Sequence, residues 1–173
     1  MAKSWRFVSE EAETISLHDH CITSVEEAGP DLVLHFDEDS FDVTKDNPLN
    51  PTGRHRNTGP AALVLENWRF LDGAFYRDCC ELWPDGTKRE LPEVPLTREM
   101  FLGGGMSIEV LAHDWKPETG ILSLDADGGL YCDEPDIPDG PEGFMTLELY
   151  AERLLFCWNE LPRDAWFQDG PRK

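Results

Sequence analysis

Arg54, His55 and Arg56 form a local cluster of basic side chains in an otherwise strongly acidic chain. Two guanidinium groups on either side of an imidazole could hold a carboxylate or a phosphate through charge-assisted hydrogen bonds. Asn47 and Asn50 add amide donors and acceptors a few residues earlier. These five residues predict a small-ligand site. They also fit a simpler interpretation, in which the asparagines form turns and the arginines pair with the protein's own carboxylates.

A second set of candidate residues lies between residues 125 and 142 and is acidic. Its carboxylates could attract a basic protein partner. The spacing is not that of a calcium-binding EF-hand, because the ordered acids, the central glycine and the closing glutamate are missing. The residues predicted to contact a partner are Asp125, Asp127, Asp133, Glu134, Asp136, Asp139 and Glu142. The alternative is a set of solvated carboxylates without a partner.

His18 and His20 are one residue apart, so a strand would place both rings on one face. Such a pair, with Glu26 on the same face, could contribute to a metal site. The segment resembles a fragment of the cupin metal motif, but it lacks that motif's glycine, its glutamate spacing and its last histidine. We therefore predict strand-surface histidines, and neither a metal nor another cofactor.

Enzymatic motifs are missing from the sequence. There is no G-x-S-x-G nucleophile motif, and residues 103–105 lack the lysine and the hydroxyl residue of a phosphate-binding loop. The cysteines have no recognisable catalytic context, although a Cys–His pair could still form in space. The sequence favours a protein that is not an enzyme.

Composition narrows the classes of partner and compartment. The 173 residues include 35 acidic and 15 basic residues, for a formal net charge of −20. Nucleic acids and anionic membranes are not expected partners, because both bind positive surfaces. The five cysteines include no C-x-x-C pair, which favours reduced thiols. The chain has neither a secretory signal nor a stretch long enough to span a membrane, so we expect a cytoplasmic protein.

Turn-forming dipeptides between short apolar runs predict a succession of β-hairpins. The clearest are Asp72-Gly73, Asp85-Gly86 and Asp127-Gly128, with further turns at 29–31 and 37–40. We expect residues 32–36 and 41–43 to pair across the turn at 37–40. Thr97 as N-cap and Gly103 as stop predict one short helix at 96–102. The other expected strands are 5–8, 15–27 with a candidate break at Asp19, 61–70, 74–78, 80–83, 88–91, 106–113, 121–124 and 130–132.

Residues 144–158 fit two interpretations. Their apolar residues lie on one face at helical spacing, which fits a helix. They also fit two strands that turn near residue 152. The hairpin is favoured because a helix would expose Leu149 and Phe156. Residues 44–60 and 133–143 read as a long loop and an acidic loop. The sequence thus predicts one mainly β domain over residues 1–173: an antiparallel sandwich or partly open barrel built from hairpins, with one short helix.

Residues 16–25, followed by a turn and residues 32–36, resemble the opening strands of small uncharacterised bacterial β-rich proteins, some of them similar to immunity proteins of toxin systems. Residues 156–159 and 165–167 resemble their C-terminal strands. The resemblance implies a bacterial, cytosolic protein without an active site. We therefore expect a non-enzymatic acidic protein-binding module, an immunity-type inhibitor of a basic toxin being one form. The alternatives are a small-ligand- or metal-binding β-barrel that uses loop 44–60, with or without enzymatic activity, and a structural subunit of an assembly.

Overall fold

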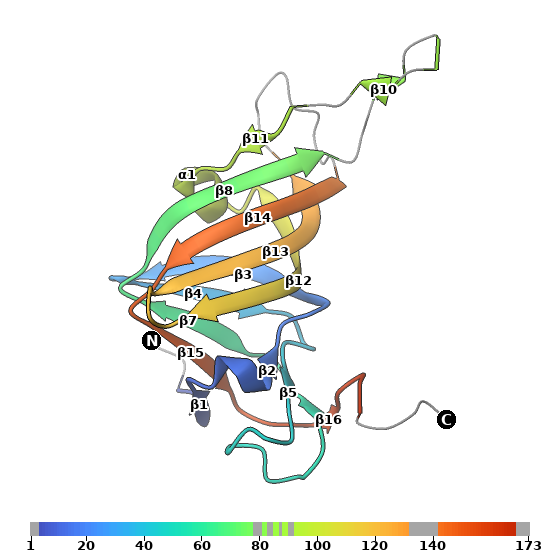
Figure 1. Ribbon diagram of the computed structural model, residues 1–173. Coiled ribbons are helices and arrows are strands. Elements are labelled where there is room, and N and C mark those ends of the chain that lie inside the picture. Colours follow the sequence, from blue (N-terminus) through green and yellow to red (C-terminus); the bar gives the residue numbers. More distant parts are fainter. Residues whose placement is uncertain are drawn as a thin grey trace.

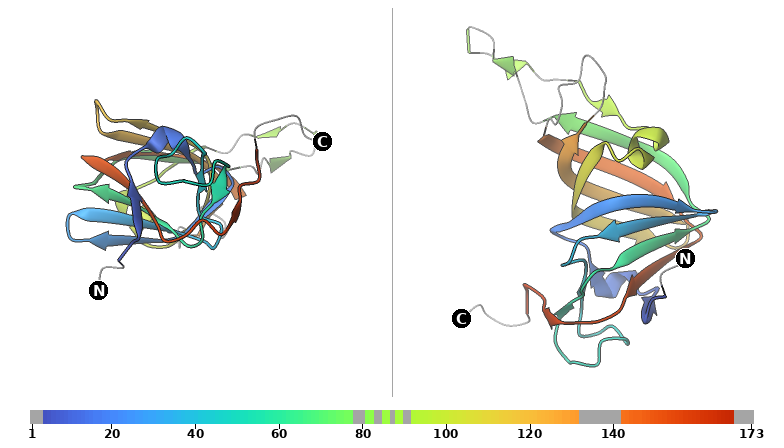
Figure 2. Two further views of the ribbon diagram at one scale, coloured as in Figure 1. Left: turned by 90° about the horizontal axis from the view of Figure 1, so that it is seen from below. Right: turned by 180° about the vertical axis from the view of Figure 1, so that it is seen from behind.

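The computed structural model describes residues 4–77, 81–82, 85–86, 88–89, 92–131 and 142–168. It is mainly β, with 55% of residues in strands and 6% in helices, as the sequence predicted. Ten strands form one antiparallel sheet in the order β1-β15-β7-β4-β3-β12-β13-β14-β8-β11. The sheet coils, but β11 and β1 lie at opposite ends of it, so that no closed barrel forms (Figures 1 and 2).

Two smaller sheets accompany the large one. One pairs β9 with β10, and the other has the order β16-β6-β5-β2. The strands are β1 (Phe7–Ser9), β2 (Ile15–Ser16), β3 (His20–Ala28), β4 (Asp31–Phe36), β5 (Asp42–Val43), β6 (Arg56–Asn57), β7 (Ala62–Glu66), β8 (Arg69–Arg77), β9 (Glu81–Leu82), β10 (Lys88–Arg89), β11 (Val94–Pro95), β12 (Met106–Lys116), β13 (Ile121–Leu130), β14 (Glu142–Tyr150), β15 (Arg153–Trp158) and β16 (Arg163–Asp164). The helices are η1 (Ala12–Thr14) and α1 (Arg98–Leu102).

The core lies on the inner face of the coiled sheet. Burial alternates along the strands, so that every second side chain of β4 is buried and its neighbours are half-exposed. Phe41 packs edge-on against Phe36 and Phe156, with ring centroids 5.1 and 5.7 Å apart. These rings and the fully buried Trp158 make the core the main source of stability, since truncating such a side chain costs about 3–5 kcal/mol.

The short helix follows the sequence prediction, and the expected strand at 106–113 is present but irregular. Thr97 caps α1 by accepting a hydrogen bond from the backbone N–H of Met100, and the helix ends at Gly103. Phe101 is buried against Trp68 and Phe70. The alternation along residues 106–113 changes phase because β12 has a bulge after Val110.

Residues 144–158 belong to two strands, β14 and β15, so the prediction of strands rather than a helix is confirmed. The predicted hairpin is wrong, because the two strands do not pair with each other. β14 pairs with β13 and β8, whereas β15 pairs with β1 and β7. Between them the chain turns a corner, where the backbone N–H groups of Ala151 and Glu152 donate to the carbonyls of Gly120 and Glu66. The corner carries the chain from one half of the sheet to the other.

Two predicted turns are wrong, because Asp127-Gly128 lies inside β13 and Asp72-Gly73 lies inside β8. At Gly128 a Cβ would lie 1.8 Å from the carbonyl oxygen of Ser107 on β12. Glycine at this position therefore permits close strand pairing rather than a turn. At Gly73 a Cβ would lie 3.1 Å from both Leu147 and Leu96. The turn at Asp85-Gly86 is confirmed, and Gly86 has a φ of 82°.

Two further pairing predictions need correction. β5 pairs with β2 and β6 rather than with β4, so residues 32–36 and 41–43 belong to different sheets. The expected strand 61–70 is two strands, β7 and β8, separated by Asn67 and Trp68, and Asn67 has a φ of 50°. The break near Asp19 is confirmed, and this residue also has a positive φ, of 64°.

Candidate functional site

The strands β8, β14, β13 and β12 lie side by side in the large sheet (Figure 1). Their outer face carries a concentration of carboxylates. Strand register aligns these side chains in rows. One row crosses from Asp72 through Glu148 and Ser123 to Asp114, and another ends with Asp127 beside Glu109. We define the acidic face by six of the exposed carboxylates of these strands: Asp72, Glu109, Asp114, Asp125, Asp127 and Glu148.

The acidic face places like charges directly opposite one another. Glu109 on β12 pairs in register with Asp127 on β13, and Asp72 on β8 with Glu148 on β14. Directly opposed residues have Cβ atoms only about 5 Å apart, and like charges in such pairs are destabilising. Within the described part of the chain, Asp114 is the one carboxylate of the face that has an ion pair, at 3.5 Å from Lys116. Among the described residues, neither opposed pair has an ion-pair partner, so the repulsion between its two carboxylates is uncompensated.

The size and borders of the face suit a macromolecule. Four strands cover about 14 Å, and residues 123–127 of β13 cover a similar length. Tyr76, which is 42% exposed, lies at one border with its ring 6.2 Å from that of Phe144. Nearby Glu93, with a smaller contribution from Asp72, raises the pKa of this phenol. Arg69 stacks on Tyr150 at the other border, 4.3 Å from the ring centre.

Two shallow depressions interrupt the face. One, of about 310 Å³, lies over Ser123, Asp125 and Thr146, and the other, of about 370 Å³, has Glu109, Asp127 and Glu142 in its lining. Among the residues that the structure describes, no three His, Cys, Asp or Glu side chains are grouped to hold one metal ion.

The structure places part of the predicted partner-binding set on this face. Asp125 and Asp127 are exposed on β13, and Glu142 begins β14 at the edge of the larger depression. Asp133, Glu134, Asp136 and Asp139 lie outside the described residues. Sequence reasoning missed Asp72, Glu109, Asp114 and Glu148. The alternation of polar and apolar residues along 106–116 was a signal for Glu109, but only the register shows which acids oppose one another.

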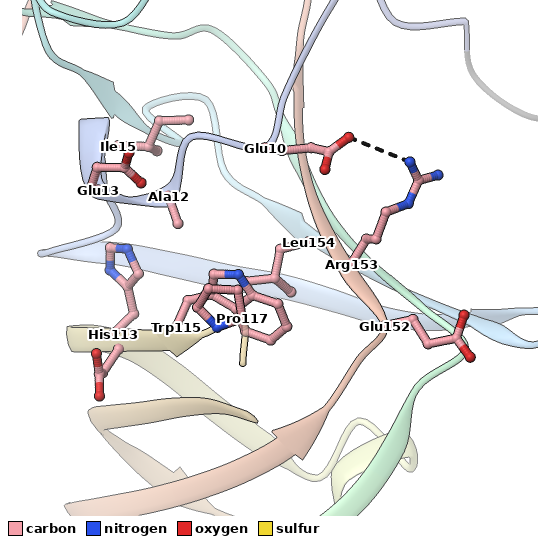
Figure 3. Close-up of a pocket in the computed structure, with 11 residues that line it drawn as sticks. Glu10, Ala12, Glu13, Ile15, His113, Trp115, Pro117, Glu152, Arg153 and Leu154 are labelled. Carbon is pink, nitrogen blue, oxygen red and sulfur yellow. Dashed lines mark hydrogen bonds and ion pairs between the residues drawn. The ribbon is translucent and has the colours of Figure 1, made fainter. Parts of the chain in front are cut away.

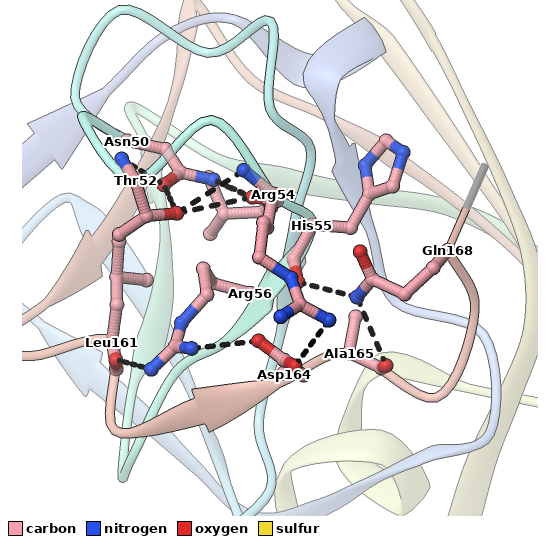
Figure 4. A network of polar contacts seen from close by, with 10 residues as sticks. Asn50, Thr52, Arg54, His55, Arg56, Leu161, Asp164, Ala165 and Gln168 are labelled. Carbon is pink, nitrogen blue, oxygen red and sulfur yellow. Dashed lines mark hydrogen bonds and ion pairs between the residues drawn. The ribbon is translucent and has the colours of Figure 1, made fainter.

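The asparagines of loop 44–60 are buried and bonded to other groups of the protein, as Figure 4 shows for Asn50. The amide nitrogen of Asn50 donates to the carbonyls of Val43, Thr44 and Arg54, at 2.8 to 3.1 Å. The amide nitrogen of Asn47 lies within hydrogen-bonding distance of the hydroxyls of Ser9 and Thr14. These donors hold the loop in shape and are not directed at a ligand.

The arginines of the loop grip a carboxylate of the protein itself (Figure 4). Arg54 and Arg56 each place a guanidinium nitrogen 2.7 Å from an oxygen of Asp164 on β16, and Arg56 also donates to the carbonyl of Leu161. His55 is buried beside Phe167 and accepts a hydrogen bond from the backbone N–H of Lys45. The structure thus joins four of the five predicted ligand-binding residues, Asn50, Arg54, His55 and Arg56, in one network that ties the loop to the C-terminal segment.

His18 and His20 do not share a ligand site. The Nδ1 of His18 lies 2.6 Å from the carbonyl of Leu111. His20 is not the surface residue that the sequence predicted, because it is buried with Nε2 3.3 Å from the fully buried Asp42. Asn57 donates to the other oxygen of Asp42 at 3.0 Å. This polar cluster joins β3 to the four-stranded sheet that contains β5 and β6.

The described cysteines, Cys21 and Cys157, are free thiols. Burial raises the pKa of Cys157 to about 11. The pKa of Cys21 is also raised, first by burial and then by the carboxylates of Glu109 and Asp37. Neither thiol has the lowered pKa of an activated nucleophile.

Searches against protein families, curated proteins and solved structures found no match to this chain. In the part of the chain that the structure describes, no helix has the length and apolar character needed to cross a membrane. Any function must therefore be inferred from the residues and their arrangement.

Proposed function

We propose that the protein is a non-enzymatic acidic binding module whose acidic face docks a basic protein. The proposal rests on two pairs of directly opposed carboxylates, Glu109 with Asp127 and Asp72 with Glu148. Within the described chain, no cation forms an ion pair with either of them. A surface that repels itself gains free energy when a partner brings lysine or arginine side chains to it. The partner thus supplies the charge that the fold lacks.

The electrostatics of the whole chain favour such a partner. A net charge of −20 attracts basic proteins over long distances and accelerates their association. The exposed ring of Tyr76 at the border of the face adds the kind of aromatic contact that protein interfaces favour. The opening strands resemble those of immunity proteins, and in that version of the proposal the partner is a bacterial toxin. The acidic face would then occupy the toxin's phosphate-binding site. The free thiols Cys21 and Cys157 support a reducing compartment such as the cytoplasm.

No observation favours the alternative of a ligand-binding loop at residues 44–60. Its asparagines bond within the protein, and its arginines are paired with Asp164. Loop 44–60 supports the fold, and the acidic face is the better candidate for recognition.

The test compares two double variants of equal charge change. Glu109→Gln with Asp127→Asn removes one opposed pair, whereas Glu11→Gln with Glu118→Gln removes two exposed acids elsewhere. Native mass spectrometry of the tagged protein, captured from its own cells, identifies a stoichiometric partner. Titration calorimetry with that purified partner then gives the affinity of each variant.

We expect a basic partner whose binding weakens about tenfold in the Glu109/Asp127 variant, mostly through the association rate, and less than about twofold in the control. We also expect affinity to fall as salt is raised. An acidic partner, equal affinities of the two variants, or an affinity insensitive to salt would contradict the proposal.

A further inference from the structure

A separate pocket of about 490 Å³ lies where the N-terminal segment, the end of β12 and the start of β15 meet (Figure 3). Its volume is within the range of small-molecule sites. Trp115, Pro117 and Leu154 give it an apolar lining, while Glu10, Glu13, His113 and Arg153 are among its polar groups. In Figure 3, Glu13 stands at one side of the hollow and the Glu10–Arg153 pair at the other, with Trp115 between them.

His113 presents a neutral ring to this pocket. Burial lowers the pKa of the imidazole below 6.5, although a hydrogen bond to the backbone of Ala12 acts in the opposite direction. That bond favours the protonated ring, so the imidazole donates it. A neutral imidazole that donates through one nitrogen keeps the other nitrogen as an acceptor.

The cation of the pocket is already paired. Arg153 lies 3.4 Å from Glu10 and donates to Glu66 at 2.6 Å. Glu13 is exposed, and among the described residues its carboxylate has no hydrogen-bond or ion-pair partner. Two further carboxylates of the lining are engaged, because Asp114 lies 3.5 Å from Lys116 and Glu152 accepts a hydrogen bond from the amide of Asn67 at 2.9 Å. The groups left for a ligand are the carboxylate of Glu13 and an imidazole acceptor, beside the partly exposed indole of Trp115. Such a combination complements a cation with an apolar body, through charge-assisted hydrogen bonds and cation–π attraction.

We propose that this pocket binds a small organic cation, with an ammonium or guanidinium group at Glu13 and an apolar body against Trp115. The same chemistry is offered by a free amine and by a lysine or arginine side chain of a protein. Of the six residues that define the acidic face, Asp114 also lines this pocket. The two proposals rest on different residues, Glu13 and Trp115 here and the opposed carboxylate pairs there, so each can fail without the other.

The experiment is a titration of the full-length protein followed by the indole N–H signals in ¹H–¹⁵N NMR spectra. The probes are 2-phenylethylamine, its uncharged counterpart 2-phenylethanol, agmatine, and the blocked peptide acetyl-Gly-Arg-Gly-amide. Trp115→Leu assigns the signal of the pocket. Glu13→Gln removes the proposed partner of the cation, and Glu11→Gln is the matched control because Glu11 is exposed on the same segment but does not line the pocket.

We expect saturable shifts of the Trp115 signal with at least one cationic probe and binding at least about tenfold weaker in Glu13→Gln than in Glu11→Gln, as expected for loss of a charge-assisted bond. Binding of the free amines assigns the site to a small molecule, and binding of the peptide alone assigns it to a protein side chain. Equal binding of 2-phenylethanol and 2-phenylethylamine, equal affinities of the two glutamate variants, or no saturable shift would overturn the proposal. Circular dichroism of each variant shows whether its fold is retained.

Discussion

At the scale of single residues, His113 makes the stability of the folded protein depend on pH. Its pKa is lowered from 6.5, chiefly by burial, so the unfolded chain binds more protons than the folded protein just below that pH. The contribution of His113 to stability is complete above about pH 6.5 and is lost as the pH falls through the interval down to the folded-state pKa. We expect His113→Gln to lose less stability on acidification than the wild type does.

Urea unfolding of both proteins at about pH 7.5 and about pH 5.5 measures this difference. The wild type should show the larger fall in the free energy of unfolding. A fall of equal size in both proteins would mean that other groups determine the acid sensitivity. The ring of His113 lies 6.4 Å from that of Phe156, so the substitution also changes packing. This effect on stability is the same at both pH values, and it cancels because each protein is compared with itself.

A single charge reversal tests the repulsion on the acidic face. In Glu109→Lys, an ammonium replaces the carboxylate opposite Asp127, and a repulsive cross-strand pair becomes an attractive one. We expect the free energy of unfolding to rise by about 0.5–1 kcal/mol. Glu118→Lys makes the same change in net charge at an exposed turn outside the sheet and should have a smaller effect. If urea unfolding shows equal gains, the benefit comes from net charge and not from the opposed pair.

At the scale of elements, β12 and β13 depend on the absence of a side chain at Gly128. A Cβ at this position would lie 1.8 Å from the carbonyl oxygen of Ser107, so the paired backbones must separate. We expect Gly128→Ala to cost about 2–3 kcal/mol. Gly53→Ala is the matched control, because Gly53 has a φ of 70° but nothing within 4 Å of an added Cβ, and its strain should cost about 1 kcal/mol. Thermal unfolding ranks the two, and a milder loss in Gly128→Ala would show that the strands tolerate separation.

The elements also show what a sequence can predict. Periodicity and capping depend on neighbouring residues, and they correctly predicted α1 and the two strands within 144–158. Pairing depends on distant residues: β14 and β15 are separated by a two-residue corner, yet each finds its partners elsewhere in the sheet. Gly128 was read as a turn residue because the same lack of a side chain serves turns and close strand contact. The acidic face was only partly predicted, because its opposed pairs exist through register alone.

At the scale of the whole molecule, stability and recognition depend on the same charges. A fold with a net charge of −20 and opposed carboxylates is more stable when partner cations cover it. The sheet is open and coiled (Figure 1). These charges lie on its outer surface, and its inner surface forms the core. Repulsion within the free protein is thus the counterpart of attraction in the proposed complex, and any treatment that screens charge should affect the two in opposite directions.

Salt provides that test on the intact protein. Raising the sodium chloride concentration from about 0.05 M to about 0.5 M shortens the screening length from about 14 Å to about 4 Å, less than the width of the acidic face. We expect the urea midpoint of the free protein to rise, because like-charge repulsion weakens. The rise should be smaller in a triple variant, Glu109→Gln with Asp127→Asn and Glu148→Gln, than in a control that neutralises Glu11, Glu99 and Glu118. Affinity for the basic partner should fall over the same range of salt. A midpoint that falls with salt, or that rises equally in both triple variants, would show that the acidic face is not where the repulsion resides.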